Sequence, residues 1–345
     1  MTQAAALAAY GSNSPSNRNR IINGSMVLDQ RNAGASTSVS AGATFYGVDR
    51  FAGFFGASAT GSTTQQASTA PAGFINSFKF AVGTGASSSS GQSAWIGQRI
   101  EGLNVADLGW GTANAKTVTL SFYVYASATG TYCVFLTNSA GDRSYVATYT
   151  ISSANTWEQK TITIAGDTSG TWLTTSGIGV SVRWDLGSGS SYNTATTSAW
   201  QAGDYRNTSS QVNVIGTSSA TFYITGVQLE AGSVTPFEHR QYGQELALCE
   251  RYFQIVLDQT RFDIYRPDGT SAAGTFTFRT HMRAIPSTFY LTRHSTIYGS
   301  VNTGAGTNGL EVTNVSEKAF GLYLFTTGVP SYAGASVSVK ASAEL

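Results

Sequence analysis

The sequence predicts an all-β protein: a jelly-roll-like β-sandwich, then a short helix, then a second, smaller β-sandwich. Charged residues make up only 11% of the chain, against roughly 25% in an ordinary soluble protein. Serine, threonine, glycine, alanine and asparagine fill the difference, which indicates many turns and a hydroxyl-rich surface. The 41% hydrophobic content argues against disorder. With 345 residues, the chain is long enough for two domains.

The strand predicted at Val118–Tyr125 has the clearest alternation in the chain. Its odd members are hydroxyl-bearing or tyrosine, and its even members are Val118, Leu120, Phe122 and Val124. This period of two predicts a strand with an apolar face turned inward. Tyr123 and Tyr125 fall on the other face, so we expect association between copies of the chain to cover them.

Further strands follow at intervals of about 12–20 residues, with no helix between them. Regular spacing of this kind predicts two facing sheets of about four to five strands each, and we assign a jelly-roll-like domain to residues 20–235. Upstream, Phe45–Phe55 is expected to form one core strand ending in a charge pair. The later strands are predicted at Thr131–Leu136, Ser144–Ile151, Trp157–Ile164 and Ile178–Trp184.

The segment Thr221–Phe253 is predicted to close this domain and begin the next. Its apolar parity changes at Gly226, which indicates a β-bulge in a strand at Thr221–Leu229. Residues 236–254 are predicted to be a linker containing a helix at Gln244–Gln254, because Leu246, Cys249 and Phe253 have helical spacing. Residues 255–345 then form the second β domain.

The N-terminal residues 1–19 have too few apolar side chains to fold alone. They are either a disordered terminus or a docking segment that a partner orders. No apolar run approaches the 18 or so residues of a membrane-spanning helix, so no membrane insertion is expected. The formal net charge of +1 gives no support for nucleic-acid binding.

No catalytic constellation, metal site or cofactor motif is predicted. The histidines, His239, His281 and His294, have no zinc-site spacing. Asp167 lies in a glycine-flanked turn that is read as a plain turn rather than a calcium site. A glycosidase needs two carboxylates beside one sugar bond, and the sequence does not show such a pair. We therefore expect no enzymatic activity, with glycan hydrolysis as the alternative.

The candidate binding residues lie in Trp184–Tyr205, a polar segment with several large aromatic side chains. Aromatic rings pack on the apolar faces of sugars, and carboxylates and amides bind their hydroxyl groups. Packing within loops or at a subunit interface is the competing explanation for the same residues. The glycan-binding candidates are Trp184, Tyr192, Trp200, Asp204 and Tyr205.

Three blocks of sequence resemble segments common in phage tail-fibre and other virion structural proteins. They are RIINGSMVLDQRNAG at 20–34, a long stretch within 100–172, and GVQLEAGSVTPFEHRQYGQELALCERYF at 226–253. The resemblance implies a protein of the virion, a tail fibre or adhesin that attaches to host-surface polysaccharide. It also implies a homo-oligomer, a trimer in particular, joined to other virion proteins through residues 1–19. The alternatives are a capsid or head-fibre decoration protein and a polysaccharide depolymerase.

Overall fold

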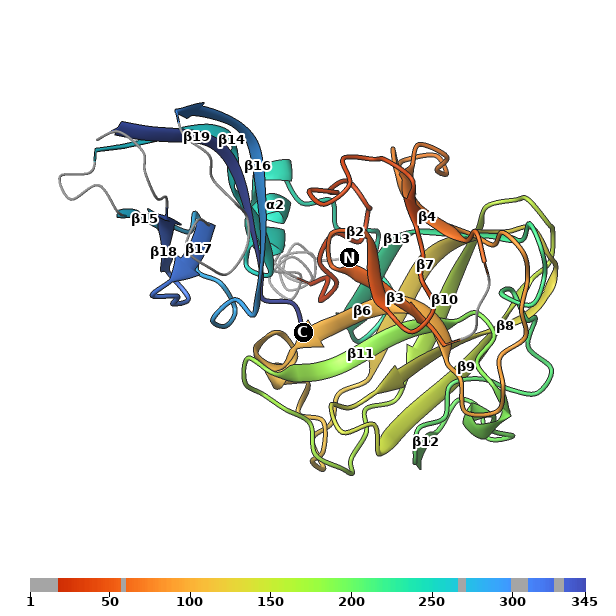
Figure 1. Ribbon diagram of the computed structural model, residues 1–345. Helices are drawn as coiled ribbons and strands as arrows, with labels where there is room; N and C mark the ends of the chain where they lie inside the picture. The colour runs from red at the N-terminus through yellow and green to blue at the C-terminus, as the bar shows by residue number, and fades with distance from the viewer. Residues whose placement is uncertain (1–17, 57–59, 266–270, 299–309, 326–331) are drawn as a thin grey trace. The chain divides into compact units, whose positions relative to one another are not determined.

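The structure is a computed structural model that describes residues 18–56, 60–265, 271–298, 310–325 and 332–345 (Figure 1). The chain divides into two compact units between Gln241 and Tyr242. The first unit contains one large hydrophobic core and the second a smaller one. The predicted N-terminal attachment segment, residues 1–19, lies outside the described residues except for Arg18 and Asn19.

The first unit is a sandwich of two antiparallel sheets, so the predicted all-β sandwich is confirmed. Both sheets are larger than predicted. The six-stranded sheet has the order β1 (Thr37–Ser38), β4 (Thr63–Ala67), β5 (Ser77–Ala81), β13 (Thr221–Ala231), β7 (Val118–Ala126), β10 (Glu158–Ile164). The seven-stranded sheet has the order β12 (Trp200–Ala202), β9 (Arg143–Ile151), β8 (Gly130–Thr137), β11 (Ile178–Asp185), β6 (Ala94–Glu101), β3 (Phe51–Phe55), β2 (Thr44–Val48).

One of the additional strands comes from the stretch expected to be a single core strand. Residues Phe45–Phe55 form most of a hairpin, β2 and β3, and the chain turns at Asp49–Arg50. Arg50 adopts the left-handed conformation that this turn requires, with φ of 70°. Its guanidinium donates a hydrogen bond to the carbonyl of Arg99 on β6 at 2.6 Å, which holds the turn against the sheet.

The core confirms the alternation predicted for β7. The even-numbered side chains of this strand, from Val118 to Val124, are completely buried. Phe122 lies at the centre, where its ring meets those of Tyr149 and Trp184 edge-on, with 5.2 Å between centroids in both pairs. Edge-to-face contacts of this kind add to the stabilisation that burial itself supplies.

The bulge predicted at Gly226 is also present. The register between β13 and β7 shifts between Thr225 and Gln228, and Gly226 has a φ of 60°. The shift allows Ile224 and Val227, which differ in parity, to be buried on the same side of the sheet. A side chain at position 226 would also meet the rings of Phe74 and Tyr123, so glycine is required here.

The outer face of β7 differs from expectation. Tyr125 packs against Trp157 and Tyr223, with ring centroids 5.5 and 5.0 Å away. Tyr123 packs on Phe74 at 5.4 Å. Neighbours in the same chain therefore already half-bury both tyrosines, and their position no longer argues for association between copies. The homo-oligomer stays a prediction from the resemblance.

The two ends of the first unit are tied together by Asn19. Its side-chain nitrogen donates to the carbonyl of Val227 at 3.0 Å, and its side-chain oxygen accepts from the amide of Leu229 at 3.1 Å. Its own amide donates to Glu238 at 2.7 Å. The first and last blocks of the tail-fibre resemblance are also in contact, because the amide of Arg20 donates to the carbonyl of Leu229 at 2.8 Å.

The first unit also contains the short 3₁₀ helices η1 (Gly102–Asn104), η2 (Ala106–Leu108) and η3 (Ser190–Tyr192). The predicted helix is α2 (Tyr242–Glu250), which belongs to the second unit. It ends before the predicted Gln254, because Phe253 starts the strand β14 (Phe253–Tyr265). No helix in the described ranges is long and apolar enough to cross a membrane.

The second unit contains two three-stranded antiparallel sheets over one core, as predicted for a smaller sandwich. Phe320 and Leu322 from one sheet and Val337 and Val339 from the other are completely buried. One sheet has the order β14, β19 (Tyr332–Ser342), β16 (Thr288–Tyr298), and the other β15 (Ser271–Thr277), β18 (Ala319–Phe325), β17 (Leu310–Thr313).

Candidate functional site

The candidate site lies on the outer face of the seven-stranded sheet, which is nearer the viewer in Figure 1. Strand alternation sends Val182 and Trp184 of β11 into the core, so Arg183 between them faces outward. The register places Arg183 directly between Gly97 of β6 and Phe135 of β8. Trp95 follows the same outward parity as Gly97.

Arg183 lies across the sheet rather than extending into solvent. Its guanidinium carbon is 4.3 Å from the ring centroid of Trp95 and 5.9 Å from that of Phe135. A Cβ at Gly97 would come within 2.9 Å of the Arg183 side chain and 2.2 Å of the Val182 carbonyl. Glycine at position 97 therefore provides the room in which Arg183 stacks on aromatic rings.

A second arginine reaches the same face from the segment after β12. The guanidinium carbon of Arg206 is 3.7 Å from the ring centroid of Tyr192 and 5.9 Å from that of Phe135. Asp204 holds it with a two-pronged ion pair at 2.5 and 3.0 Å. The Tyr192 hydroxyl donates to the carbonyl of Gly91 at 3.1 Å, which fixes the ring beneath Arg206.

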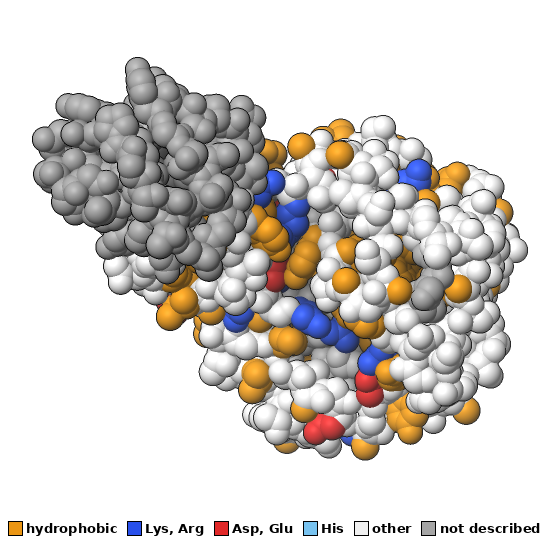
Figure 2. Space-filling view, in the orientation of Figure 1, with side chains coloured by type: hydrophobic (Ala, Val, Ile, Leu, Met, Phe, Trp, Pro, Cys, Tyr) orange, Lys and Arg blue, Asp and Glu red, His pale blue; other side chains and the backbone are white. Residues whose placement is uncertain are grey.

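We call this region the aromatic–arginine surface. The rings of Trp95 and Phe135 form its floor, because both are almost completely buried. The arginines and the other rings lie above that floor and are partly exposed. Figure 2 shows lysine and arginine side chains gathered in a hollow of this face, with hydrophobic side chains around it. The surface consists of Phe54, Trp95, Arg99, Phe135, Arg183, Tyr192, Asp204, Tyr205 and Arg206.

The electrostatics of the surface centre on Arg183. Burial lowers its pKa to about 9, and the positive charges of Arg99 and Arg206 add to this effect. Asp204 acts in the opposite direction. A guanidinium with this pKa is still protonated at pH 7, so the surface keeps a net positive charge in a partly desolvated position.

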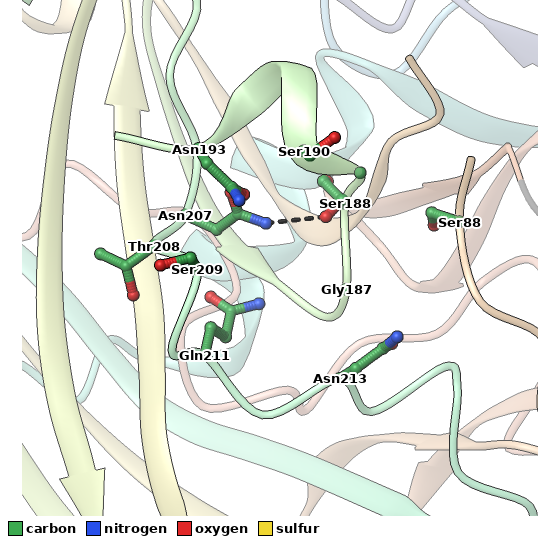
Figure 3. Close-up of a pocket in the computed structure, with 11 residues that line it drawn as sticks. Ser88, Gly187, Ser188, Ser190, Asn193, Asn207, Thr208, Ser209, Gln211 and Asn213 are labelled. Atoms are coloured by element: carbon green, nitrogen blue, oxygen red, sulfur yellow. Dashed lines mark hydrogen bonds between the residues drawn. The ribbon is translucent and has the colours of Figure 1, made fainter. Parts of the chain in front are cut away.

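A small polar pocket adjoins the surface (Figure 3). It encloses about 200 Å³, and hydroxyl and amide side chains line it. Asn193 and Asn207 face it and form an isolated bridge with each other. They follow Tyr192 and Arg206 in the chain, so the pocket lies beside the aromatic–arginine surface. Ser188, Ser190 and Gln211 contribute further hydrogen-bonding groups.

Asp185 lies buried behind this pocket. Its Oδ1 accepts hydrogen bonds from the Ser188 amide at 3.0 Å and from the Gln211 side chain at 2.6 Å. Its Oδ2 has no hydrogen-bond partner among the described residues. Burial raises the pKa of Asp185 above its ordinary value, although the hydrogen bonds to Oδ1 act in the opposite direction.

The first unit is expected to become less stable as pH rises, and Asp185→Asn should lose less stability than the unsubstituted protein, because asparagine does not titrate. A raised pKa means that the folded state holds the proton more tightly than the unfolded state. The unfolding free energy therefore falls as pH rises from the ordinary value of 3.8 towards the folded-state pKa. Melting temperatures of both proteins between pH 4 and 8 test this, and parallel curves for the two would contradict it.

The five predicted glycan-binding residues lie in three different places in the structure. Tyr192, Asp204 and Tyr205 lie on the aromatic–arginine surface, where ligand contact stays a prediction. Trp184 is completely buried in the core, so its assignment as a contact residue was wrong. Trp200 packs edge-on against Trp110 and Trp172 in a separate cluster.

Loop packing, the alternative explanation weighed for these residues, therefore accounts for Trp200. Its indole nitrogen donates to the carbonyl of Ala165 at 2.7 Å, so the polar part of the ring is also used within the fold.

Sequence reasoning missed the members of the surface that come from the sheet. In β6, Trp95 and Arg99 share the parity opposite to that of Ile96 and Ile100, which marks them as outward-facing. Arg183 is marked in the same way between two core residues. Parity does not say which strands are neighbours, so it could not bring these residues together.

No protein-family model matches the chain, and no curated protein is significantly similar to it. Weak structural similarity exists to the enzymatically active domain of tailspike protein 4 of bacteriophage CBA120, with a TM-score of 0.32 and 12% identity. That match covers 62% of this chain but only 22% of the tailspike chain.

Two carbohydrate-binding modules are similar at the same level. A family 4 module matches with a TM-score of 0.26 and 16% identity, covering 45% of this chain and 84% of the module. The family 11 module of a cellulosomal cellulase from Clostridium thermocellum has a TM-score of 0.29 and 12% identity. It covers 59% of this chain and 99% of the module. Similarity this low carries no argument about the ligand of this chain.

Within the described residues, no group of three or more histidine, cysteine, aspartate or glutamate side chains is arranged to hold a metal ion.

Proposed function

We propose that this chain is a phage virion structural protein, a tail fibre or adhesin, that attaches to host-surface glycan through the aromatic–arginine surface. The observation that carries the proposal is the combination of partly exposed rings and fixed guanidinium groups in one hollow. Sugars offer apolar ring faces and many hydroxyl groups, so a binding surface needs both flat apolar partners and hydrogen-bond donors. Phe54, Tyr192 and Tyr205 supply the first, and the arginines the second.

The adjoining pocket supports the same proposal. Its serine, asparagine and glutamine side chains can both donate and accept hydrogen bonds, as sugar hydroxyl groups do. A glycan lying along the surface can place a neighbouring sugar ring against these groups without meeting a charge.

The virion role is supported by the three blocks that resemble tail-fibre proteins. Under this proposal the protein is located in the virion, forms a homotrimer and is joined to other virion proteins through residues 1–19. Location on the capsid or on a head fibre is the alternative, and imaging of virions that carry a label on this protein distinguishes the two.

We propose binding without hydrolysis. A depolymerase working on this surface would need two carboxylates beside the sugar bond. Asp204 is the one carboxylate among the nine residues of the surface, and both its oxygens are engaged by Arg206. Incubation with a bound polysaccharide should therefore leave the polymer length unchanged, and shortening of the polymer would favour the depolymerase.

Phe54→Ala and Tyr205→Ala are each expected to weaken glycan binding about tenfold, because exposed rings in a binding hollow contribute on the order of 1–2 kcal/mol. An array of bacterial capsular and O-antigen polysaccharides gives the measurement. Tyr125→Ala, on the outer face of the other sheet, is the matched control and should bind normally. Unchanged binding by both variants would move the site elsewhere, and an equal loss in the control would mean that the six-stranded sheet takes part.

A further inference from the structure

Positive charge concentrates on the aromatic–arginine surface, although the chain as a whole is almost neutral. The sequence has 20 basic and 19 acidic residues, whereas the surface carries Arg99, Arg183 and Arg206 against the single carboxylate of Asp204. Asp204 is paired with Arg206, so it is not available to neutralise the guanidinium of Arg183, for which the described residues provide no ion pair. A ligand that brings negative charge would correct this local imbalance.

Arg183 shows most clearly that the imbalance is built into the fold. Its guanidinium is partly buried near the positive charges of Arg99 and Arg206, which is energetically unfavourable. None of the described residues accepts a hydrogen bond from it. Arg143, elsewhere in the same sheet, is instead paired with Asp167 at 2.7 and 2.8 Å. Arg183 is therefore oriented by Trp95 and Gly97 while its N–H donors stay unused.

A guanidinium in this state is suited to an oxyanion. Its planar set of N–H groups matches the oxygens of a carboxylate or a phosphate, and such charge-assisted bonds are stronger than neutral ones. Stacking on Trp95 fixes the plane of the group in advance, so little conformational entropy is lost when the anion binds.

We propose that the aromatic–arginine surface recognises an acidic glycan, with Arg183 at its centre binding an anionic substituent of the sugar, a carboxylate or a phosphate. This inference rests on the proposed glycan-binding function and narrows it to a class of polymer. The neutral part of the repeating unit lies towards the pocket, where the Ser190 hydroxyl and the Asn193 amide face its hydroxyl groups.

A glycan fits the surroundings better than a nucleic acid. Nucleic-acid binding draws on many phosphate contacts from a broad basic surface. Here the three arginines lie beside a pocket that neutral hydroxyl and amide side chains line. The surface thus suits an anionic substituent on a sugar whose hydroxyl groups reach the neutral pocket, rather than a bare phosphate backbone.

The first test compares each polymer with its neutral form. The full chain is titrated by calorimetry with polygalacturonate and with polysialic acid, each in native and carboxyl-reduced form, and with a glycerol-phosphate teichoic acid. We expect binding of at least one anionic polymer that weakens as NaCl is raised. For the carboxylate polymers, reduction of the carboxyl groups should abolish binding. If only the teichoic acid binds, the site is assigned to phosphate. A single-stranded oligonucleotide should not bind.

The second test uses variants that are expected to change the affinity for the anionic polymer in opposite directions. Arg183→Gln should weaken binding of the anionic polymer about 30-fold or more, since a buried charge-assisted contact is lost. Lys79→Gln removes the same charge from the outer face of the six-stranded sheet and should leave binding unchanged. Asp204→Asn should tighten binding, because it removes the carboxylate that competes for the arginines. Thermal unfolding confirms that each variant is folded; if Arg183→Gln fails to fold, the sign of Asp204→Asn still decides.

The outcomes separate this inference from the proposed function. Binding that survives carboxyl reduction and depends on Phe54 but not on Arg183 would overturn the acidic ligand and leave glycan attachment standing. Tighter binding of the oligonucleotide than of any polysaccharide would overturn the inference in favour of a nucleic acid. No binding of any polymer, charged or neutral, would count against both.

Discussion

Trp184→Ala is expected to lower the unfolding free energy of the first unit by about 3–5 kcal/mol, the usual result of truncating a completely buried tryptophan. The ring has no exposed surface, and it meets Phe122 edge-on at the centre of the core. Removing it leaves a cavity that both sheets line. Because the sheets are fixed by their ladders, they cannot close this cavity completely.

Chemical denaturation followed by circular dichroism gives the measurement. Trp157→Ala is the matched control, because Trp157 packs on Tyr125 on the outer face of the other sheet and is only partly buried. We expect a clearly smaller loss for the control. Equal losses would show that the centre of the core has been placed wrongly.

Arg143→Met is the second substitution with a large expected effect, a loss of about 3–5 kcal/mol. Arg143 forms a two-pronged pair with Asp167, whose side chain is only 3% exposed. Without the guanidinium, a buried carboxylate loses its counter-charge. The same pair fixes the turn after β10, where Trp172 joins the cluster around Trp200.

The control is another two-pronged pair, Arg206 with Asp204, in which the arginine is 12% exposed and the carboxylate 37%. Arg206→Met should cost at most about 1 kcal/mol, because the carboxylate that it leaves without a partner is accessible to solvent. The double variant Arg143→Met with Asp167→Leu should recover much of the loss, since it leaves no unpaired charge. A double variant no more stable than Arg143→Met would mean that the pair is not the cause.

Much of the sandwich could be predicted because alternation along a strand is a local property. The even residues of β7 faced the core as expected, and the change of parity at Gly226 located the bulge. The turn inside Phe45–Phe55 was missed for a local reason as well. Neither glycine nor proline marks it, and Arg50 takes the left-handed conformation that sequence patterns seldom assign to an arginine.

The candidate site was only half predictable. Tyr192, Asp204 and Tyr205 stood out as aromatic and acidic residues in a polar loop. Trp184 was grouped with them because it precedes that loop, although it lies near the end of β11 with its side chain turned inward. Trp95 and Arg183 are 88 positions apart in the sequence and meet only through the pairing of β6 with β11. Such pairing depends on the whole sheet and cannot be read from either strand.

The contacts of Asn19 have a consequence for how a sandwich of this kind can be carried by other proteins. Since Asn19 bonds to Val227, Leu229 and Glu238, the start and the end of the folded unit lie next to each other. A module with adjacent ends can be inserted into a surface loop of a host protein without stretching either one. Residues 19–241 should therefore be transferable as a single cassette, bringing their ligand preference to a new carrier.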